Sequence, residues 1–359
     1  MRIFQILVTL MLGDAIGNYT LLLDRAFKLA GIDSKIYAIN IGKGLSQENI
    51  CPYDALPILQ PQDIVIYHMC ESTTINADIK NMNCKKIAIY HNATPAHFFA
   101  RYEPGMCQKQ ALSIHEIQDL NGSFDWCIAD SAYNKDDLVR YGYDPDKITV
   151  IPVLLDFDDY RQTPDKKVIE KYSDGFTNLL FVGRVVPNKK QEDIVRIFAW
   201  YKKHINPRSR LILIGAPFGD TYINSIREYI QALDLSDVIF PGHISFAEIL
   251  AFYRVADIFL CMSEHEGFCV PLVEAMMFDV PIIAYASSAI PDTLGDAGVL
   301  IDEKDPVLVS KIIDQIVSDP DIRRRLIDIQ RERLKDFHED IVFEKIYRVV
   351  SSFRGEDLT

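Results

Sequence analysis

Residues 264–276 read Glu264-His265-Glu266-Gly267-Phe268-Cys269-Val270-Pro271-Leu272-Val273-Glu274-Ala275-Met276 and lie between an expected strand and an expected helix. We expect Glu266 in the loop that ends the strand, and Glu274 in the first turn of a helix that begins near Pro271, a favoured first helical position. The free N–H groups of Leu272 and Val273, with the helix dipole, would then form an anion site beside both carboxylates. Taken alone, Glu274 is also explained as an acid that stabilises a helix N-terminus.

A second candidate anion site lies upstream, where the apolar run 179–182 ends in Gly183-Arg184-Val185-Val186-Pro187-Asn188-Lys189-Lys190. Gly183 would let the backbone approach a ligand closely. Arg184 and Lys189 are close enough in one loop to reach the same dianion, the first as a bidentate fork and the second as a mobile point charge. A solvated surface loop explains this pattern equally well when it is taken alone.

The whole chain of 359 residues alternates short apolar runs with helical patterns, which is typical of parallel strands covered on both faces. Expected strands in the first half are 3–10, 35–38, 64–68, 86–90, 126–129 and 148–151. After a polar stretch, 156–175, which we interpret as a linker, further strands are expected at 179–182, 210–214, 238–240, 258–261, 282–285 and 298–301. We therefore predict an α/β fold with domains at 1–160 and 161–340, and a final helix at 341–359 that packs back on the first domain.

Composition narrows the class of ligand. With 38 Lys and Arg against 51 Asp and Glu, the formal net charge is −13, which argues against nucleic acid as a partner. The seven cysteines form no C-x-x-C pair, so a reducing, cytoplasmic compartment is favoured over a disulfide framework or structural zinc. The apolar run 3–12 is too short to span a bilayer, and we interpret it as a buried first strand rather than a signal peptide.

Together the two loops resemble the nucleotide-sugar site of retaining GT-B glycosyltransferases of family 4, the glycosyl transferases group 1 type. The marks of that resemblance are Glu266-x7-Glu274 and the upstream pair of Arg184 and Lys189. Residues 176–302 resemble the carboxyl-terminal domain of the family closely, and residues 1–150 resemble its first domain more loosely. The resemblance implies two Rossmann-like α/β domains that face each other across a cleft.

The resemblance also implies roles for residues of the second half. Arg184 and Lys189 would bind the diphosphate, and Glu274 would bind the nucleotide ribose. Glu266 would hold hydroxyls of the donor sugar, and the amide of Leu272 would touch the distal phosphate. The base would lie near His243-Ile244-Ser245. The full set of expected donor-binding residues is Gly13, Asp14, Gly183, Arg184, Lys189, Ile244, Glu266, Gly267, Phe268, Val270, Leu272 and Glu274.

Two features of the first half enter the expected site. Gly13 and Asp14 follow the first strand and resemble the glycine loop by which the first domain of the family approaches the diphosphate, although a plain βα turn also explains them. His91 ends the strand 86–90, where the family often has a histidine that faces the donor sugar. We therefore expect His91 to be catalytic, together with Arg184, Lys189 and Glu266. His68 also ends a strand, but a structural role is the simpler interpretation.

No metal or cofactor is expected. Asp-x-Asp pairs, which hold metals in a different glycosyltransferase fold, occur at Asp144, Asp156 and Asp319, scattered as chance would place them. The basic pair of Arg184 and Lys189 can neutralise the leaving group instead.

The expected reaction moves a hexosyl group from a UDP- or GDP-sugar to a hydroxyl of a glycan or lipid-linked glycan, with retention, in cell-surface polysaccharide or glycoconjugate biosynthesis. Peripheral contact with the cytoplasmic face of the membrane is implied by the family alone. Two alternatives stay open: a nucleotide-sugar epimerase of the same architecture, and a non-catalytic module that binds nucleotide sugar without releasing diphosphate.

Overall fold

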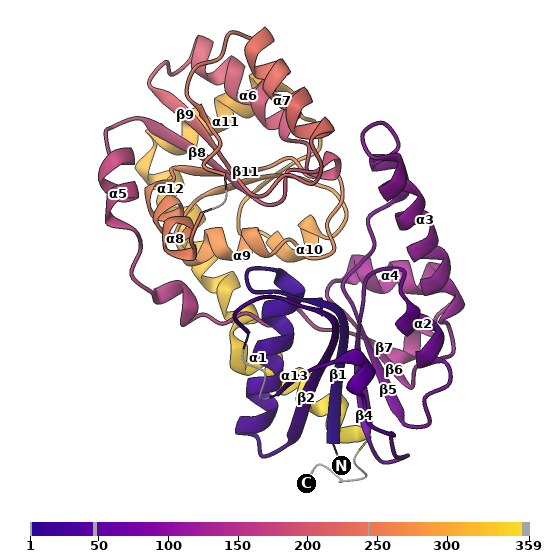
Figure 1. The fold of residues 1–359 in the computed structure, drawn as a ribbon. Coiled ribbons are helices and arrows are strands. Elements are labelled where there is room, and N and C mark those ends of the chain that lie inside the picture. The colour runs from indigo at the N-terminus through magenta and orange to yellow at the C-terminus, as the bar shows by residue number, and fades with distance from the viewer. Residues whose placement is uncertain (1, 46–48, 243, 354–359) are drawn as a thin grey trace. The chain divides into compact units, whose positions relative to one another are not determined.

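The computed structural model describes residues 2–45, 49–242 and 244–353, and the chain divides into two compact units. The first unit comprises Met1–Ala96, Gly105–Phe157 and Phe337–Thr359, and the second comprises His97–Pro104 and Asp158–Asp336. Each unit is a parallel sheet covered by helices on both faces (Figure 1). This is the α/β architecture that the apolar strand pattern predicts.

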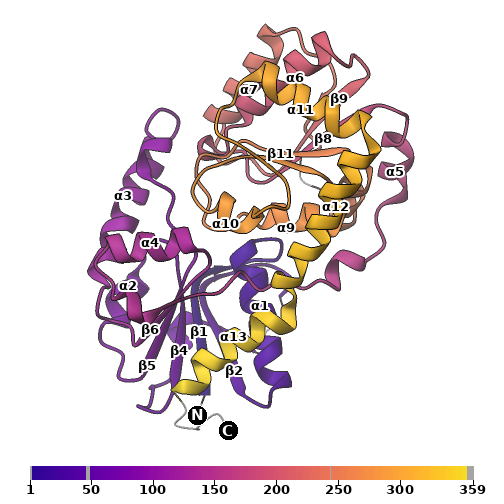
Figure 2. The same ribbon diagram turned by 180° about the vertical axis from the view of Figure 1, so that it is seen from behind.

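The first unit has a seven-stranded sheet in the order β3-β2-β1-β4-β5-β6-β7. Helices α2, α3 and α4 share an apolar cluster with one face of the sheet, which includes Phe4, Tyr67 and Leu138. On the other side, α1 carries Phe27, whose ring meets Phe343 of α13 at 5.7 Å, and Figure 2 shows α13 beside α1. The elements are β1 Arg2–Leu10, α1 Ala15–Leu29, β2 Asp33–Ile41, β3 Ile50–Pro52, β4 Ile64–Met69, α2 Thr74–Ile79, β5 Lys85–Tyr90, α3 Pro104–Asp119, β6 Trp126–Ala129, α4 Ala132–Arg140, β7 Ile148–Val150 and α13 Glu339–Ser352.

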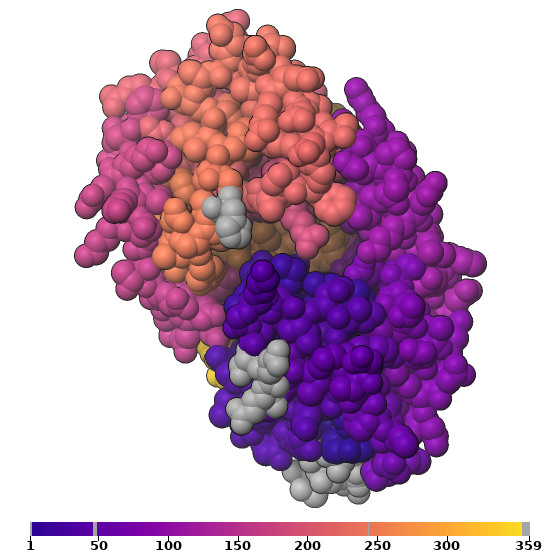
Figure 3. Space-filling view, in the orientation of Figure 1, coloured from indigo at the N-terminus to yellow at the C-terminus, as the bar shows by residue number. Residues whose placement is uncertain are grey.

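The second unit has a six-stranded sheet in the order β10-β9-β8-β11-β12-β13. Helices α6, α7 and α11 bury a cluster that includes Phe198, Tyr222 and Ile313 against one face, and α7 lies on the surface of the unit (Figure 3). The elements are α5 Lys166–Tyr172, β8 Thr177–Val182, α6 Gln191–His204, β9 Ser209–Ile214, α7 Thr221–Ala232, β10 Val238–Ile239, α8 Phe246–Val255, β11 Ile258–Cys261, α9 Val270–Met277, β12 Ile282–Tyr285, α10 Ile290–Leu294, β13 Val299–Ile301, α11 Pro306–Ser318 and α12 Pro320–Leu334. No helix within the described ranges is both long and apolar enough to cross a bilayer.

The structure corrects the sequence interpretation of residues 156–175. This stretch is not only a linker, because it holds α5 and the short 3-10 helix η4, Asp159–Arg161. Asp165 caps α5 by accepting the Val168 N–H at 3.0 Å, and Tyr172 packs its ring against Phe252 of α8 at 5.2 Å. A polar helix of two turns gives a weak periodic signal, so packing rather than pattern decides it.

In each sheet the strand order reverses once, between β1 and β4 and between β8 and β11. Ligands of open α/β sheets bind outside the carboxyl ends of the strands at such a reversal. In the second unit, the expected site loops follow β8 and β11, the two strands that flank this point.

Gly215, which follows β9, lies where the loops after β8 and β9 pack closely against each other. A Cβ at this position would stand 1.9 Å from the carbonyl oxygen of Gly183, and the φ of Gly215 is +149°. The Gly183 N–H already donates to the Ile214 carbonyl at 2.9 Å, so the two backbones cannot separate freely. We expect Gly215→Ala to lower the free energy of unfolding by about 3 kcal/mol or more, measured by urea denaturation.

The matched control is Gly105→Ala in α3, where an added Cβ meets no atom within 4 Å. Alanine favours a helix over glycine by up to about 1 kcal/mol, so this variant should be as stable as the wild type or more stable. Equal unfolding curves for the two variants would contradict the close packing at Gly215.

Candidate functional site

The loops after β8 and β11 lie side by side in the second unit. The two strands pair in parallel, with Leu179 opposite Ile258 and Leu180 opposite Phe259. Parallel neighbours end at the same edge of a sheet, so residues far apart in sequence meet there. This pairing and the contacts between the loops bring the Arg184–Lys189 loop and the Glu266 loop together, whereas their joint binding of a ligand stays a prediction.

Asn188 joins the loop after β8 to the loop after β11 through two hydrogen bonds. Its backbone carbonyl accepts the Glu264 N–H at 2.8 Å, and its side-chain Nδ2 donates to the His265 carbonyl at 2.9 Å. The side chain is buried, so both bonds are shielded from water. Sequence reasoning missed Asn188, because an asparagine after a proline in a loop is an ordinary turn residue.

Lys189 and Glu266 form a buried ion pair at this junction. Lys189 Nζ donates to Glu266 Oε2 at 2.5 Å, and the Glu266 side chain is 6% exposed. The Glu266 N–H donates to Ser288 Oγ at 2.7 Å, which holds the backbone. Burial acts to lower the pKa of Lys189, but the Glu266 carboxylate outweighs it and the pKa of Lys189 is raised. The ammonium therefore stays charged in a fixed position.

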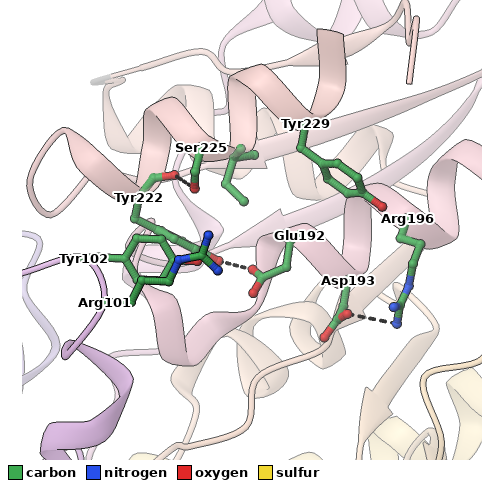
Figure 4. A pocket seen from close by; sticks show the side chains of 9 residues that line it. Arg101, Tyr102, Glu192, Asp193, Arg196, Tyr222, Ser225 and Tyr229 are labelled. Atoms are coloured by element: carbon green, nitrogen blue, oxygen red, sulfur yellow. Dashed lines mark hydrogen bonds and ion pairs between the residues drawn. The ribbon is translucent and has the colours of Figure 1, made fainter. Parts of the chain in front are cut away.

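Arg184 presents an exposed side chain, while its backbone is held by a network that sequence reasoning did not identify. Gln191 Nε2 donates to the Arg184 carbonyl at 2.9 Å. The Gln191 N–H donates to Tyr222 Oη at 3.1 Å, and Tyr222 donates in turn to Glu192. Tyr222 lines a cavity of about 330 Å³ (Figure 4), with Arg101, Tyr102, Glu192, Asp193, Arg196, Ser225, Ile226 and Tyr229. Helices α6 and α7 thus position the Arg184 backbone.

Helix α9 differs from expectation at its first turn. The helix begins at Val270, so Glu274 lies in the second turn and not the first. The Leu272 N–H is not free, because it donates to the Cys269 carbonyl at 3.0 Å. Cys269, the residue that precedes the helix, has a left-handed conformation with φ at +72°. Pro271 has no N–H, and of the two amides that the sequence predicts to be free, that of Leu272 is therefore excluded.

Glu274 is held by two tyrosines. Tyr160 Oη donates to its Oε1 at 2.7 Å, and Tyr253 Oη donates to its Oε2 at 2.6 Å. Burial raises the pKa of Glu274, and the two hydrogen bonds lower it in part. Each carboxylate oxygen has two lone-pair sites, so one per oxygen is left after these bonds.

The other expected residues of the second unit lie around this centre. Gly267 is half-buried, and the carbonyl of the buried Phe268 accepts the Thr293 hydroxyl at 2.5 Å. Ile244 is half-buried and precedes Ser245, the N-cap of α8, whereas His243 lies outside the described residues. His265 is buried, which lowers its pKa to about 4 and leaves it neutral near pH 7.

In the first unit, His91 is buried within a polar chain. Its Nδ1 lies 2.7 Å from Asp130 Oδ2, and its Nε2 lies 2.9 Å from His68 Nδ1. His68 is itself 3.2 Å from Gln5 Oε1, and burial lowers the pKa of His68 well below its usual value. Both ring nitrogens of His91 are engaged, so a contact with substrate would require the His68 contact to open. Sequence reasoning did not connect His68 with His91, although their strands are neighbours.

Asp14 caps α1, which starts at Ala15, and its carboxylate accepts the Gly17 N–H at 3.4 Å. Gly13 has φ at +79°, and no atom lies within 4 Å of the position a Cβ would take. The turn interpretation therefore accounts for the local structure of both residues, and the space above Gly13 is open.

One group of described side chains has metal-ligand spacing. Cys261 and Cys269, with Sγ atoms 3.9 Å apart, lie with Glu266 so that the ligand atoms are within 4.8 Å of one another. The Glu266 carboxylate already forms an ion pair with Lys189, and the positive charge of Lys189 would repel a metal cation at this position. The expectation that no metal is required stays a prediction.

The chain is similar in sequence to known glycosyltransferases. Residues 162–333 match the family described as "Glycosyl transferases group 1". A D-inositol 3-phosphate glycosyltransferase of Acidothermus cellulolyticus is 28% identical over 230 residues, 61% of this chain and 51% of that protein. A GDP-mannose-dependent alpha-(1-6)-phosphatidylinositol monomannoside mannosyltransferase of Mycolicibacterium smegmatis is 25% identical over 183 residues, 47% of each protein. The chain thus spans about half the length of the curated relatives it matches.

The fold has solved counterparts over its full length. The structure of HepE from Anabaena in complex with UDP-glucose superimposes with a TM-score of 0.77 and 17% identity, covering 98% of this chain and 100% of that one. At that identity the likeness establishes the fold, which is the GT-B arrangement of two Rossmann-like units.

The Lys189–Glu266 pair makes a testable contribution to stability. We expect a double-mutant cycle of Lys189→Met and Glu266→Gln, read by urea unfolding, to give a coupling of about 1–3 kcal/mol, because either single change leaves one charge buried alone. The control is Lys335→Met with Glu332→Gln, a pair of the same types at the same 2.5 Å but on the surface. That coupling should stay below roughly 0.5 kcal/mol. Equal couplings in the two cycles would mean that the site pair is effectively solvated.

Proposed function

We propose that this chain, which has the GT-B fold and matches the glycosyl transferases group 1 family over residues 162–333, moves a hexosyl group from a nucleoside-diphosphate sugar to a hydroxyl of a glycan or lipid-linked glycan. The observation that carries the proposal is the meeting of the Arg184–Lys189 loop with the Glu266 loop at the strand-order reversal between β8 and β11. Cations and carboxylates there match a ligand that has both phosphates and hydroxyls.

Each part of the donor has a suitable partner in this site. Arg184 and Lys189 take the diphosphate, and the Gly183 turn allows the backbone to approach it. Glu266 accepts from sugar hydroxyls through the carboxylate sites that Lys189 leaves open, beside Gly267 and Phe268. Val270 replaces Leu272 as the amide at the start of α9 that faces the distal phosphate, since the Leu272 N–H is engaged. Glu274 accepts from the ribose hydroxyls, and Ile244 lies near the base.

The reaction is sugar–O–NDP plus acceptor–OH giving sugar–O–acceptor plus NDP, with the anomeric configuration retained. Its barrier is departure of the diphosphate from an oxocarbenium-like sugar. Lys189, fixed by Glu266 before substrate arrives, and Arg184 stabilise the charge that develops on the phosphate. A carboxylate that is bonded to an ammonium is a weak nucleophile, which disfavours a covalent intermediate on Glu266. We therefore favour same-face attack, in which the departing phosphate takes the acceptor proton.

We assign Gly13 and Asp14 to the approach of the diphosphate from the first unit, which the open space above Gly13 supports. His91 remains a candidate catalytic residue on the condition that its contact with His68 opens. The scheme uses the two basic side chains to neutralise the leaving group and includes no metal or other cofactor.

The relatives guide the choice of donor. The HepE structure holds UDP-glucose, and the Mycolicibacterium relative is named as GDP-mannose-dependent. We propose a UDP- or GDP-sugar as donor and a role in cell-surface polysaccharide or glycoconjugate biosynthesis. We place the reaction in the cytoplasm, with peripheral contact at the inner face of the membrane where lipid-linked acceptors lie.

The proposal is tested first by nucleotide binding. A thermal-shift panel of UDP, GDP, ADP and their sugars should show stabilisation by one base series, because a ligand that binds the folded state raises the melting temperature by mass action. Release of diphosphate on addition of an acceptor separates the transferase from a module that only binds donor. A chain stabilised by no member of the panel would not be a nucleotide-sugar enzyme.

Variants test the residue roles. We expect Arg184→Ala and Lys189→Ala each to lower the rate of donor turnover by about a hundredfold or more, because each removes a charge that stabilises the leaving group. Lys203→Ala removes the same charge from an exposed position at the end of α6 and should leave the rate unchanged. Wild-type rates in both site variants would refute the assignment of the diphosphate to this loop.

A further inference from the structure

We propose that Tyr160 is a positioning residue for nucleotide binding, which orients the Glu274 carboxylate toward the ribose. This inference rests on the proposed function, because it takes Glu274 as the carboxylate that binds the ribose. It adds to that function a residue outside the expected motif and a prediction about pH.

Tyr160 reaches Glu274 from outside the sheet core of the second unit. It lies in η4, three residues after Phe157, the last residue of the central segment of the first unit. Its hydroxyl donates to Glu274 Oε1 at 2.7 Å, a strong hydrogen bond because the acceptor is charged. The segment that connects the two units is therefore bonded directly to the proposed ribose carboxylate.

Aromatic packing fixes the direction of the Tyr160 hydroxyl. The ring meets Phe246, at the start of α8, edge-on at 5.5 Å, and Phe278, just after α9, at 6.5 Å. Phe278 also stacks on Tyr253, the second donor to Glu274, at 5.3 Å. One phenylalanine thus supports both tyrosines, and the two hydroxyls converge on one carboxylate, one on each oxygen.

The two hydroxyls are the groups that favour the charged form of Glu274. Burial raises the pKa of Glu274, and the hydrogen bonds from Tyr253 and Tyr160 oppose that rise. No ion pair to Glu274 is found among the described residues; Arg254 of α8 instead stacks its guanidinium on Phe278 at 5.6 Å. A protonated Glu274 would present fewer acceptors to ribose hydroxyls, so donor affinity depends on keeping this carboxyl ionised.

The loss of the Tyr160 hydroxyl has a predictable effect on the pH dependence of nucleotide binding. Removal of the Tyr160 hydroxyl takes away a bond that lowers the pKa of Glu274, so that pKa rises further. The carboxyl then becomes protonated at a higher pH, and nucleotide binding weakens earlier as the solution is acidified. The loss is largest below neutral pH and shrinks as the pH is raised.

The experiment compares Tyr160→Phe with the wild type, using whichever of UDP, GDP and ADP binds in the thermal-shift panel. We expect the Kd of the nucleotide to rise about tenfold near neutral pH, the scale of one hydrogen bond to a charged group, and the acid limb of the Kd profile to move to higher pH. Donor KM should rise with little change in kcat, because Glu274 does not touch the reacting atoms. Tyr229→Phe, the same change on a half-buried tyrosine of α7, should alter neither Kd nor KM.

Inorganic pyrophosphate distinguishes positioning from a general structural role. It carries the phosphates without a ribose, so its affinity should be the same in Tyr160→Phe and the wild type. Equal losses for pyrophosphate and nucleotide would show that the variant disturbs the whole site and would overturn the inference, as would a wild-type nucleotide Kd at every pH. The Glu274→Gln variant separates the two proposals. If this variant binds nucleotide normally, the assignment of Glu274 to the ribose fails. If it loses nucleotide binding while Tyr160→Phe binds nucleotide like the wild type, only the role of Tyr160 is refuted.

Discussion

The parallel pairing of β8 with β11 is the constraint on which the proposed site depends. It places the carboxyl ends of two strands side by side at the point where the order of this sheet reverses, which is where ligands of open α/β sheets bind. Asn188 then joins the two loops with one backbone and one side-chain hydrogen bond. With that junction set, Lys189 reaches Glu266, and the charges of the site are fixed before any ligand enters.

The positions of the charged groups in the proposed site depend on this junction between the two loops. An acidic chain with a net charge of −13 holds its cations at the site by pairing them with carboxylates. Lys189 is held by Glu266, while Lys304 bridges Glu264 and Asp193 at 2.8 and 2.9 Å. Such pairs lower the net positive charge that a phosphate meets, but they fix where each cation stands. Preorganised charge of this kind stabilises a developing anion without a reorganisation step.

The carboxylates of the motif are in different environments, although their residue type is the same. Glu266 is paired with a cation, and Glu274 is held by two neutral tyrosines and has a raised pKa. One of those tyrosines comes from the segment that follows the first unit in sequence. In the first unit, a chain of polar contacts from Gln5 through His68 and His91 to Asp130 links β1 and β4 with the residues that follow β5 and β6. Polar groups are thus organised at the strand ends of both sheets.

Much of the fold is determined by local patterns in the sequence. Apolar runs bounded by turn residues predict every strand of the described residues except β3 to within a few residues, because strand burial acts over short distances. The short elements β3 and α5 are not predicted from the sequence, because they depend on contacts with residues that are distant along the chain. The motif residues Arg184, Lys189, Glu266 and Glu274 are predicted as site residues from their spacing together with the resemblance to a known family. Their partners are not predicted, because Asn188, Gln191 and Tyr160 carry no local signal. The left-handed Cys269 and the engaged Leu272 amide are likewise not evident from the sequence. The sequence by itself therefore indicates which groups are candidates to bind a donor, whereas only the tertiary structure decides which of them are already bonded, because hydrogen-bond partners are chosen by distance in space.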